Sequence, residues 1–122
     1  MIGYVTIGTN DIQNSAKFYD ALLAELGAKR FMQADTFIAW ATVPDKPALA
    51  ISKPADGKTA TVGNGVMVAL QASSPQQVDA LYAKAIELGA TDEGPAGPRG
   101  DSFYAGYFRD LDGNKLNFFC MT

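Results

Sequence analysis

Hydrophobic positions recur with helical spacing in two segments, one in each half of the chain. The first segment runs from about Asp11 to Leu26, and the second begins at Ser74. Their apolar stripes are predicted at Ile12, Ala16, Tyr19, Leu22, Leu23 and Leu26, and at Val78, Leu81, Tyr82, Ala85 and Leu88. Asn10 or Asp11 can cap the first helix, and Ser74 with Gln77 three positions on forms a capping-box arrangement. The pattern therefore predicts one amphipathic helix in each half.

Short β-prone segments surround each predicted helix, with one before it and three after it. In the first half they are Tyr4–Ile7, Lys29–Ala34, Thr36–Val43 and Ala48–Lys53. In the second half they are Met67–Leu70, Ala90–Glu93, Phe103–Arg109 and Lys115–Cys120. Asp110–Asn114 (DLDGN) is a strong turn signal between the last two, in which Asp110 and Asp112 are expected to bond local backbone amides.

The two halves share this order of elements, which indicates an internal repeat. The tetrapeptide ELGA at 25–28 recurs at 87–90, each time at the end of a helical pattern where glycine suits a left-handed backbone. The prediction is one domain over 1–122, with module one at 1–53, a linker at 54–64 and module two at 65–122. A generic α+β sandwich with chance self-similarity is the alternative.

Composition limits the function classes. The net charge is −3 and no Lys/Arg stripe occurs, so nucleic acid is not expected as a partner. No apolar run is long enough to cross a membrane, the N-terminus does not resemble a signal peptide, and a single Cys120 suits a reducing cytoplasm. The chain contains no histidine, which excludes any mechanism that needs an imidazole.

Four stretches resemble the vicinal oxygen chelate superfamily, which includes glyoxalase I, the bleomycin-resistance proteins and extradiol dioxygenases. They are 4–8 (YVTIG), 10–20 with ND and KFYD, 63–70, and 108–117 (FRDLDGNKLN), which is similar to the family's F-x-D-P-D-G-N-x-x-E signature. The resemblance implies an α+β fold in which paired βαβββ modules form a curved, half-open mixed β-barrel with helices outside. It also implies a small-molecule pocket and, by analogy alone, a homodimer.

Enzymes of this superfamily hold a divalent metal with His and Glu side chains at the first and last strands of each module. The resemblance places those four positions at Tyr4, near Ala50, at Met67 and at Asn117. A phenol, a methyl group, a thioether and an amide are poor ligands for a hard or borderline divalent cation. We therefore expect no metal or other cofactor, and no metal-dependent lactoylglutathione lyase or dioxygenase activity.

Strand alternation predicts which side chains line the pocket. Tyr4 and Thr6, Met67, Ala69 and Gln71, and Asn117 and Phe119 are expected on the cavity face. The helix side is expected to hold Val5, Ile7, Val66, Val68, Leu70, Leu116, Phe118 and an inert thiol at Cys120. The predicted ligand-binding residues are Tyr4, Trp40, Met67, Arg99, Tyr107, Asn117 and Phe119, with the side of Trp40 undetermined.

Some of these residues also have a structural interpretation. Tyr4, Met67 and Phe119 could fill a collapsed barrel, and Asn117 could bond Tyr4 or Tyr107. Arg99 could hold a ligand carboxylate or lie solvated on its loop.

Three functions remain compatible with the sequence. The first is metal-free binding of a hydrophobic or aromatic metabolite or antibiotic. The second is lyase or isomerase chemistry of an unorthodox kind, using Tyr4, Asn117 or a loop acid. The third is an interaction protein with a filled barrel. The sequence favours the first.

Overall fold

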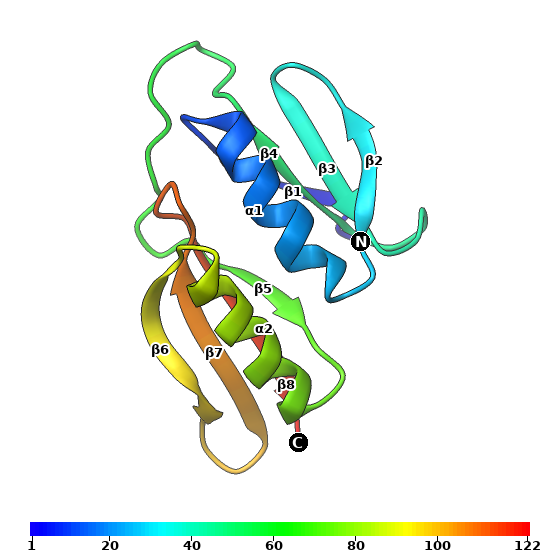
Figure 1. Ribbon diagram of the computed structural model, residues 1–122, viewed down its shortest axis with the longest axis vertical. Coiled ribbons are helices and arrows are strands. Elements are labelled where there is room, and N and C mark those ends of the chain that lie inside the picture. The colour runs from blue at the N-terminus through cyan, green and yellow to red at the C-terminus, as the bar shows by residue number, and fades with distance from the viewer. The chain divides into compact units, whose positions relative to one another are not determined.

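A computed structural model describes residues 1–122 as two units with the same order of elements (Figure 1). The units cover 1–62 and 63–122, and the boundary between them falls inside the predicted linker at 54–64. Each unit is a four-stranded sheet with one helix, in the order β-α-β-β-β that the sequence predicts. Neither helix is long and apolar enough to cross a membrane.

The first unit contains β1 to β4 and α1. Their bounds are β1 Tyr4–Gly8, α1 Ile12–Ala24, β2 Lys29–Gln33, β3 Phe37–Ala41 and β4 Ala48–Ser52. The strand order is β1-β4-β3-β2, with β1 parallel to β4 and the other neighbours antiparallel. The outer strand β1 is therefore joined to the rest of the sheet only through β4.

The second unit repeats this topology. Its bounds are β5 Val68–Gln71, α2 Pro75–Glu87, β6 Thr91–Pro98, β7 Phe103–Arg109 and β8 Lys115–Met121. The order is β5-β8-β7-β6, again with the first strand parallel to the last. The predicted repeat and α+β fold class are confirmed.

Helix ends follow the sequence signals closely. The Asp11 carboxylate caps α1 by accepting a hydrogen bond from Asn14 N at 3.2 Å. The Ser74 hydroxyl caps α2 at Gln77 N, while the Gln77 side chain accepts from Ser73 N, one residue before the usual capping-box partner. Gly89 follows α2 with φ +108°, the left-handed backbone that favours glycine.

The first core forms where α1 packs on its sheet. Tyr19 of α1 lies 5.7 Å from Trp40 of β3 between ring centroids, and both side chains are buried. Trp40 Nε1 also donates to Asp20 Oδ1 at 2.9 Å, and the same carboxylate accepts two hydrogen bonds from Arg30 on β2. The Arg30 hydrogen bond lowers the pKa of Asp20. This cluster ties α1 to the β2–β3 hairpin.

The second core places α2 against β7 and β8. Phe108 and Phe118 stack at 5.5 Å in this core and are fully buried. Gly106 lies directly beneath Tyr82 of α2, since a Cβ at this position would be 2.9 Å from the Tyr82 ring. The Tyr82 hydroxyl donates to Asp92 at 2.7 Å; burial, and then this bond, raise the pKa of Tyr82 to about 12.

Most strand boundaries differ from the prediction by one or two residues, and those of β5 and β6 matter for the placement of side chains. β5 begins at Val68, so Val66 precedes the strand and is 61% exposed, and its predicted place in the helix-side core is wrong. A turn at Gly63–Val66 turns the chain immediately before the strand, which removes Val66 from the alternating pattern. β6 extends to Pro98 and contains two register shifts against β7.

Candidate functional site

The second sheet has one face packed on α2 and an opposite face, here called the helix-free face. Leu116 and Phe118 point to α2 and are fully buried, so Asn117 and Phe119 between and after them point the other way, as predicted. Tyr107 of β7 pairs with Asn117, which places it on the same face. Alternation therefore brings the predicted pocket residues of β7 and β8 together.

Asn117 occupies the centre of this face, between β5 and β7. Its register partners are Ala69 and Tyr107, and its exposed fraction is 1%. Its Oδ1 atom is buried and accepts no hydrogen bond from any group of the chain. The structure therefore lacks the hydrogen bond from a tyrosine hydroxyl to this oxygen that the structural interpretation requires. A buried acceptor without a donor is unfavourable and requires an explanation.

Arg99 folds back over the same face instead of extending into solvent. Its Nη1 donates to Gly97 O at 3.0 Å and to Pro98 O at 3.3 Å, and its Nη2 donates to Pro95 O at 2.7 Å. The guanidinium carbon lies 5.4 Å from the centre of the Tyr107 ring. The β6 carbonyls and an aromatic ring hold this side chain, which is half-buried and not freely solvated.

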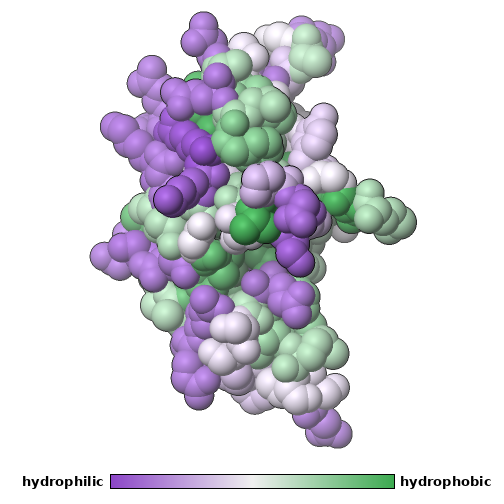
Figure 2. Space-filling model, turned by 90° about the vertical axis from the view of Figure 1, so that its right-hand side faces the viewer, coloured by the Kyte–Doolittle hydropathy of each residue, from purple (hydrophilic) through white to green (hydrophobic).

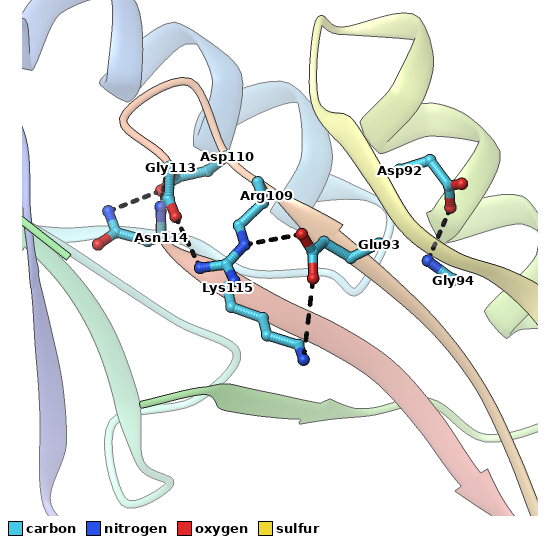
Figure 3. A network of polar contacts seen from close by, with 8 residues as sticks. All are labelled: Asp92, Glu93, Gly94, Arg109, Asp110, Gly113, Asn114 and Lys115. Carbon is cyan, nitrogen blue, oxygen red and sulfur yellow. Dashed lines mark hydrogen bonds and ion pairs between the residues drawn. The ribbon is translucent and has the colours of Figure 1, made fainter. Parts of the chain in front are cut away.

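A second cation approaches Tyr107 from β8. Lys115 Nζ is 5.6 Å from the ring centre and 3.9 Å from Glu93 Oε2. Figure 3 shows Arg109 and Lys115 converging on Glu93, with Arg109 Nε 3.2 Å from Glu93 Oε1. Arg99 does not share in this pairing and has no carboxylate partner in the chain. The sequence reasoning missed Glu93, Arg109 and Lys115, although Lys115 shares the face of Asn117 by simple alternation.

The carboxylates of the DLDGN turn have a structural role. Asp110 is 5% exposed, and its Oδ1 accepts from Asp112 N and Asn114 N, each at 2.9 Å. Figure 3 shows Asp110 beside Asn114 and Gly113 of this turn. Gly113 completes the turn with φ +88°. The predicted backbone bonding is confirmed for Asp110.

Apolar groups complete the helix-free face. Phe119 stacks on Phe103 of β7 with ring centroids 5.4 Å apart. Met67 lies just before β5 and is 39% exposed. Cys120 is buried, in agreement with its predicted place on the helix side of the sheet. The face thus combines aromatic and apolar area with a few polar groups.

The first sheet has a corresponding helix-free face. Tyr4 is 62% exposed there, and its ring meets Phe37 edge-on at 6.1 Å. Thr6, Gly8 and Ser52 share this face by alternation and register. With residues 53–56 and 59–61 they line a hollow of about 450 Å³. That volume is within the range of about 300–1,000 Å³ found for small-molecule sites.

Trp40 does not belong to either helix-free face. It pairs with Leu49 on the α1 side of the first sheet and is 2% exposed. Its indole N–H donates a hydrogen bond to the Asp20 carboxylate. Its predicted pocket role is therefore corrected to a core role.

Several large apolar side chains remain at the surface. Figure 2 shows hydrophobic residues in patches among hydrophilic ones on the face it displays. The exposed apolar residues are Met1, Ile2, Tyr4, Phe31, Met32, Val43, Val62, Val66, Met67, Ile86, Leu111 and Met121. Scattered exposure of this kind is normal, so their number alone does not define a site.

The four positions implied for metal ligands do not fit a divalent cation. In the first unit, Ala50 is a fully buried methyl group and Tyr4 a largely exposed phenol. In the second, Met67 supplies a thioether and Asn117 a neutral amide, which lack the charge that such ions require. No group of three or more His, Cys, Asp or Glu side chains in the structure could hold a metal ion.

Comparisons with known proteins agree with this architecture. A model of the glyoxalase/bleomycin resistance protein/dioxygenase superfamily matches residues 1–118. A crystal structure of a glyoxalase/bleomycin resistance protein from Albidiferax ferrireducens T118 is 38% identical, with a TM-score of 0.89 over 98% of this chain and 97% of that one.

More distant structures share the fold alone. An enzyme of the same family from Burkholderia phytofirmans PsJN is 19% identical, with a TM-score of 0.76 over 96% of this chain and 95% of that one. A lactoylglutathione lyase from Agrobacterium tumefaciens is 16% identical, with a TM-score of 0.71 over 98% and 92%. No protein of curated function matches the sequence. The family match over nearly the whole chain, together with the 38% identical relative, establishes that the chain belongs to the glyoxalase/bleomycin resistance protein/dioxygenase superfamily.

Proposed function

We propose that this protein binds a small organic molecule without a metal, and that its ligand has a hydrophobic or aromatic body. The observation that carries the proposal is Asn117. At a position where the resemblance places a metal-binding glutamate, the chain has a neutral amide whose buried Oδ1 has no donor. A ligand that supplies a donor to this oxygen would remove the cost of leaving it unpaired.

The surroundings of Asn117 support ligand binding on the helix-free face of the second sheet. Tyr107 and Phe119 provide aromatic area beside the amide, and Met67, just before β5, is a flexible and partly exposed apolar group. Ligand sites usually combine such area with a small number of fixed polar groups. Tyr4 would offer similar aromatic area on the first sheet.

The proposal includes a homodimer in the cytoplasm, with a metabolite or antibiotic and not nucleic acid as the partner. The family analogy supports the dimer. The single cysteine supports the cytoplasmic location, and the net charge of −3 argues against nucleic acid as a partner. Light scattering coupled to size-exclusion chromatography would measure the oligomeric state directly. A mass of one chain at micromolar concentration would contradict the dimer.

The main test combines metal analysis with ligand screening. Protein purified without chelators should contain no stoichiometric Ni, Zn or Mn by elemental analysis. Its melting temperature should rise saturably with members of a library of aromatic and hydrophobic metabolites and antibiotics, and chelator should not reduce the rise. An Asn117→Leu variant should show a clearly smaller ligand-induced rise than the wild type, whereas Asn114→Leu in the DLDGN turn should keep the full rise.

Two results would contradict the proposal. Stoichiometric metal with turnover of the glutathione–methylglyoxal hemithioacetal would establish metal-dependent lyase activity. Equal ligand-induced shifts in wild type and Asn117→Leu would show that the amide does not take part in binding.

A further inference from the structure

Positive charge accumulates on the helix-free face of the second sheet. Three cations, Arg99, Arg109 and Lys115, are held there, and Glu93 is the carboxylate that pairs with Arg109 and Lys115. Arg99 is left with carbonyl partners and the Tyr107 ring. The local balance is therefore an excess of positive charge beside an aromatic ring, although the chain as a whole has a net charge of −3.

Arg99 is fixed in place but retains hydrogen-bonding capacity. A guanidinium has five N–H groups. Arg99 donates three hydrogen bonds within the chain, to Gly97 O, Pro98 O and Pro95 O. At least two N–H groups remain for another acceptor. Because the side chain is already ordered, a carboxylate that binds to it would not have to meet the full entropic cost of immobilising a flexible arginine.

Asn117 lies across Tyr107 from this cation and requires the opposite kind of group. It is the cross-strand partner of Tyr107, whose ring lies under the Arg99 guanidinium. Directly opposed residues have Cβ atoms about 4.5–5.5 Å apart. The unpaired Oδ1 needs a hydroxyl or an N–H. The face therefore offers an anion-binding group and a donor-binding group, and both lie beside the Tyr107 ring.

We infer that the ligand class is an aromatic or apolar organic acid whose carboxylate lies near a hydroxyl or N–H, with Arg99 and Lys115 attracting the carboxylate and Asn117 accepting from the donor. This inference rests on the proposed binding function and narrows it. Neutral hydrophobic compounds, and acids without the donor, bind less well.

The test uses three matched probes on each of two aromatic scaffolds. 3-Phenyllactate has both the carboxylate and the hydroxyl, 3-phenyllactamide lacks the charge, and 3-phenylpropanoate lacks the hydroxyl. The three indole analogues repeat the set. Calorimetric titration of wild type should show the hydroxy acid binding about tenfold more tightly than either partial probe on at least one scaffold, since each tenfold step corresponds to about one charge-assisted hydrogen bond.

Variants assign each preference to a side chain. Arg99→Gln should bring the hydroxy acid and its amide within about twofold of each other, as expected for the loss of one such bond. Lys115→Gln leaves the Arg99 loop intact and should reduce the same ratio partially. Asn117→Leu should remove the preference for the hydroxyl and keep the preference for the acid. Lys84→Gln removes a lysine from α2, whose ion pair with Glu87 is remote from this face, and should change neither ratio.

The outcomes separate the two proposals. If acid and amide bind equally in wild type, the inferred ligand class is overturned and the binding function stands. If the acid preference survives in both Arg99→Gln and Lys115→Gln, the assignment of the carboxylate site is overturned. If none of the six probes binds and the library screen also finds no ligand, the proposed function itself fails.

Discussion

Replacing Asn117 by leucine should make the protein more stable, the reverse of most core substitutions. The amide is 1% exposed and its Oδ1 has no donor, so folding removes this atom from water without compensation. Leaving a buried acceptor unpaired costs about 1–3 kcal/mol. Leucine has the same branching pattern and no polar atom, so it removes this cost.

The expected gain is smaller than the whole desolvation cost. Leucine methyl groups are larger than an amide, and crowding in a closely packed site costs about 1–3 kcal/mol when it is not relieved. Burial of the added apolar area offsets part of that cost, at about 25 cal/mol per Å². We expect the free energy of unfolding to rise by about 1–2 kcal/mol, which for a chain of this size corresponds to about 4–8 °C in melting temperature.

Urea unfolding followed by circular dichroism measures this change, and a thermal scan checks it. Asn114→Leu is the matched control, because its amide donates to Asp110 Oδ2 at 3.1 Å in a partly buried turn. The control should lose about 0.5–1.5 kcal/mol, the usual value of one hydrogen bond. A destabilised Asn117→Leu would show that the amide is satisfied in the folded protein, and the argument for a ligand donor would then fail.

Three further substitutions test the packing and the ionisations of the fold. Gly106→Ala places a Cβ 2.9 Å from the Tyr82 ring and should lower the free energy of unfolding by about 1–3 kcal/mol in urea; an unchanged midpoint would contradict the close packing. The pKa of Tyr82 rises from 10.0 to about 12 on folding, so its stabilisation is complete below pH 10 and is lost as the pH rises through 12. Tyr82→Phe should make the urea midpoint depend less on pH across that interval. If the midpoint of the variant falls as steeply with pH as that of the wild type, the assignment to Tyr82 is refuted. Arg30 lowers the pKa of Asp20, so this contribution is complete above the ordinary pKa of 3.8 and is lost as the pH falls below it. Asp20→Asn should therefore be less stable than wild type at pH 7 and approach it in acid, whereas a constant difference would contradict the ion pair.

The fold could be predicted because each local signal agreed with the next. Caps, apolar stripes and the glycine after each helix define both helices, and the DLDGN turn fixes the register in which Tyr107 faces Asn117. Alternation then assigns the sides of β8, because Asn117 interrupts an otherwise apolar strand.

Other positions could not be placed because their signals were weak. Strand β3 reads FIAWA, so both faces are apolar and alternation does not determine the side of Trp40. Val66 lies in an apolar run after glycines, and only the turn at Gly63–Val66 shows that the strand starts later. Arg99 depends on contacts with β6 carbonyls and on Gly94, where a Cβ would be 3.2 Å from the guanidinium. Such contacts arise from the register shifts of β6, which no local pattern specifies.

The repeat supplies an internal control for the role of Asn117. Ala50 occupies the equivalent position in the first unit, since each lies on the strand between the parallel first strand and the antiparallel neighbour. Ala50 is as completely buried as Asn117, yet it has no polar atom to satisfy. The βαβββ fold therefore does not require an amide at this position, and a methyl group is sufficient for packing. The amide in the second unit therefore costs stability that the first unit avoids, and packing does not account for it, whereas the proposed ligand contact does.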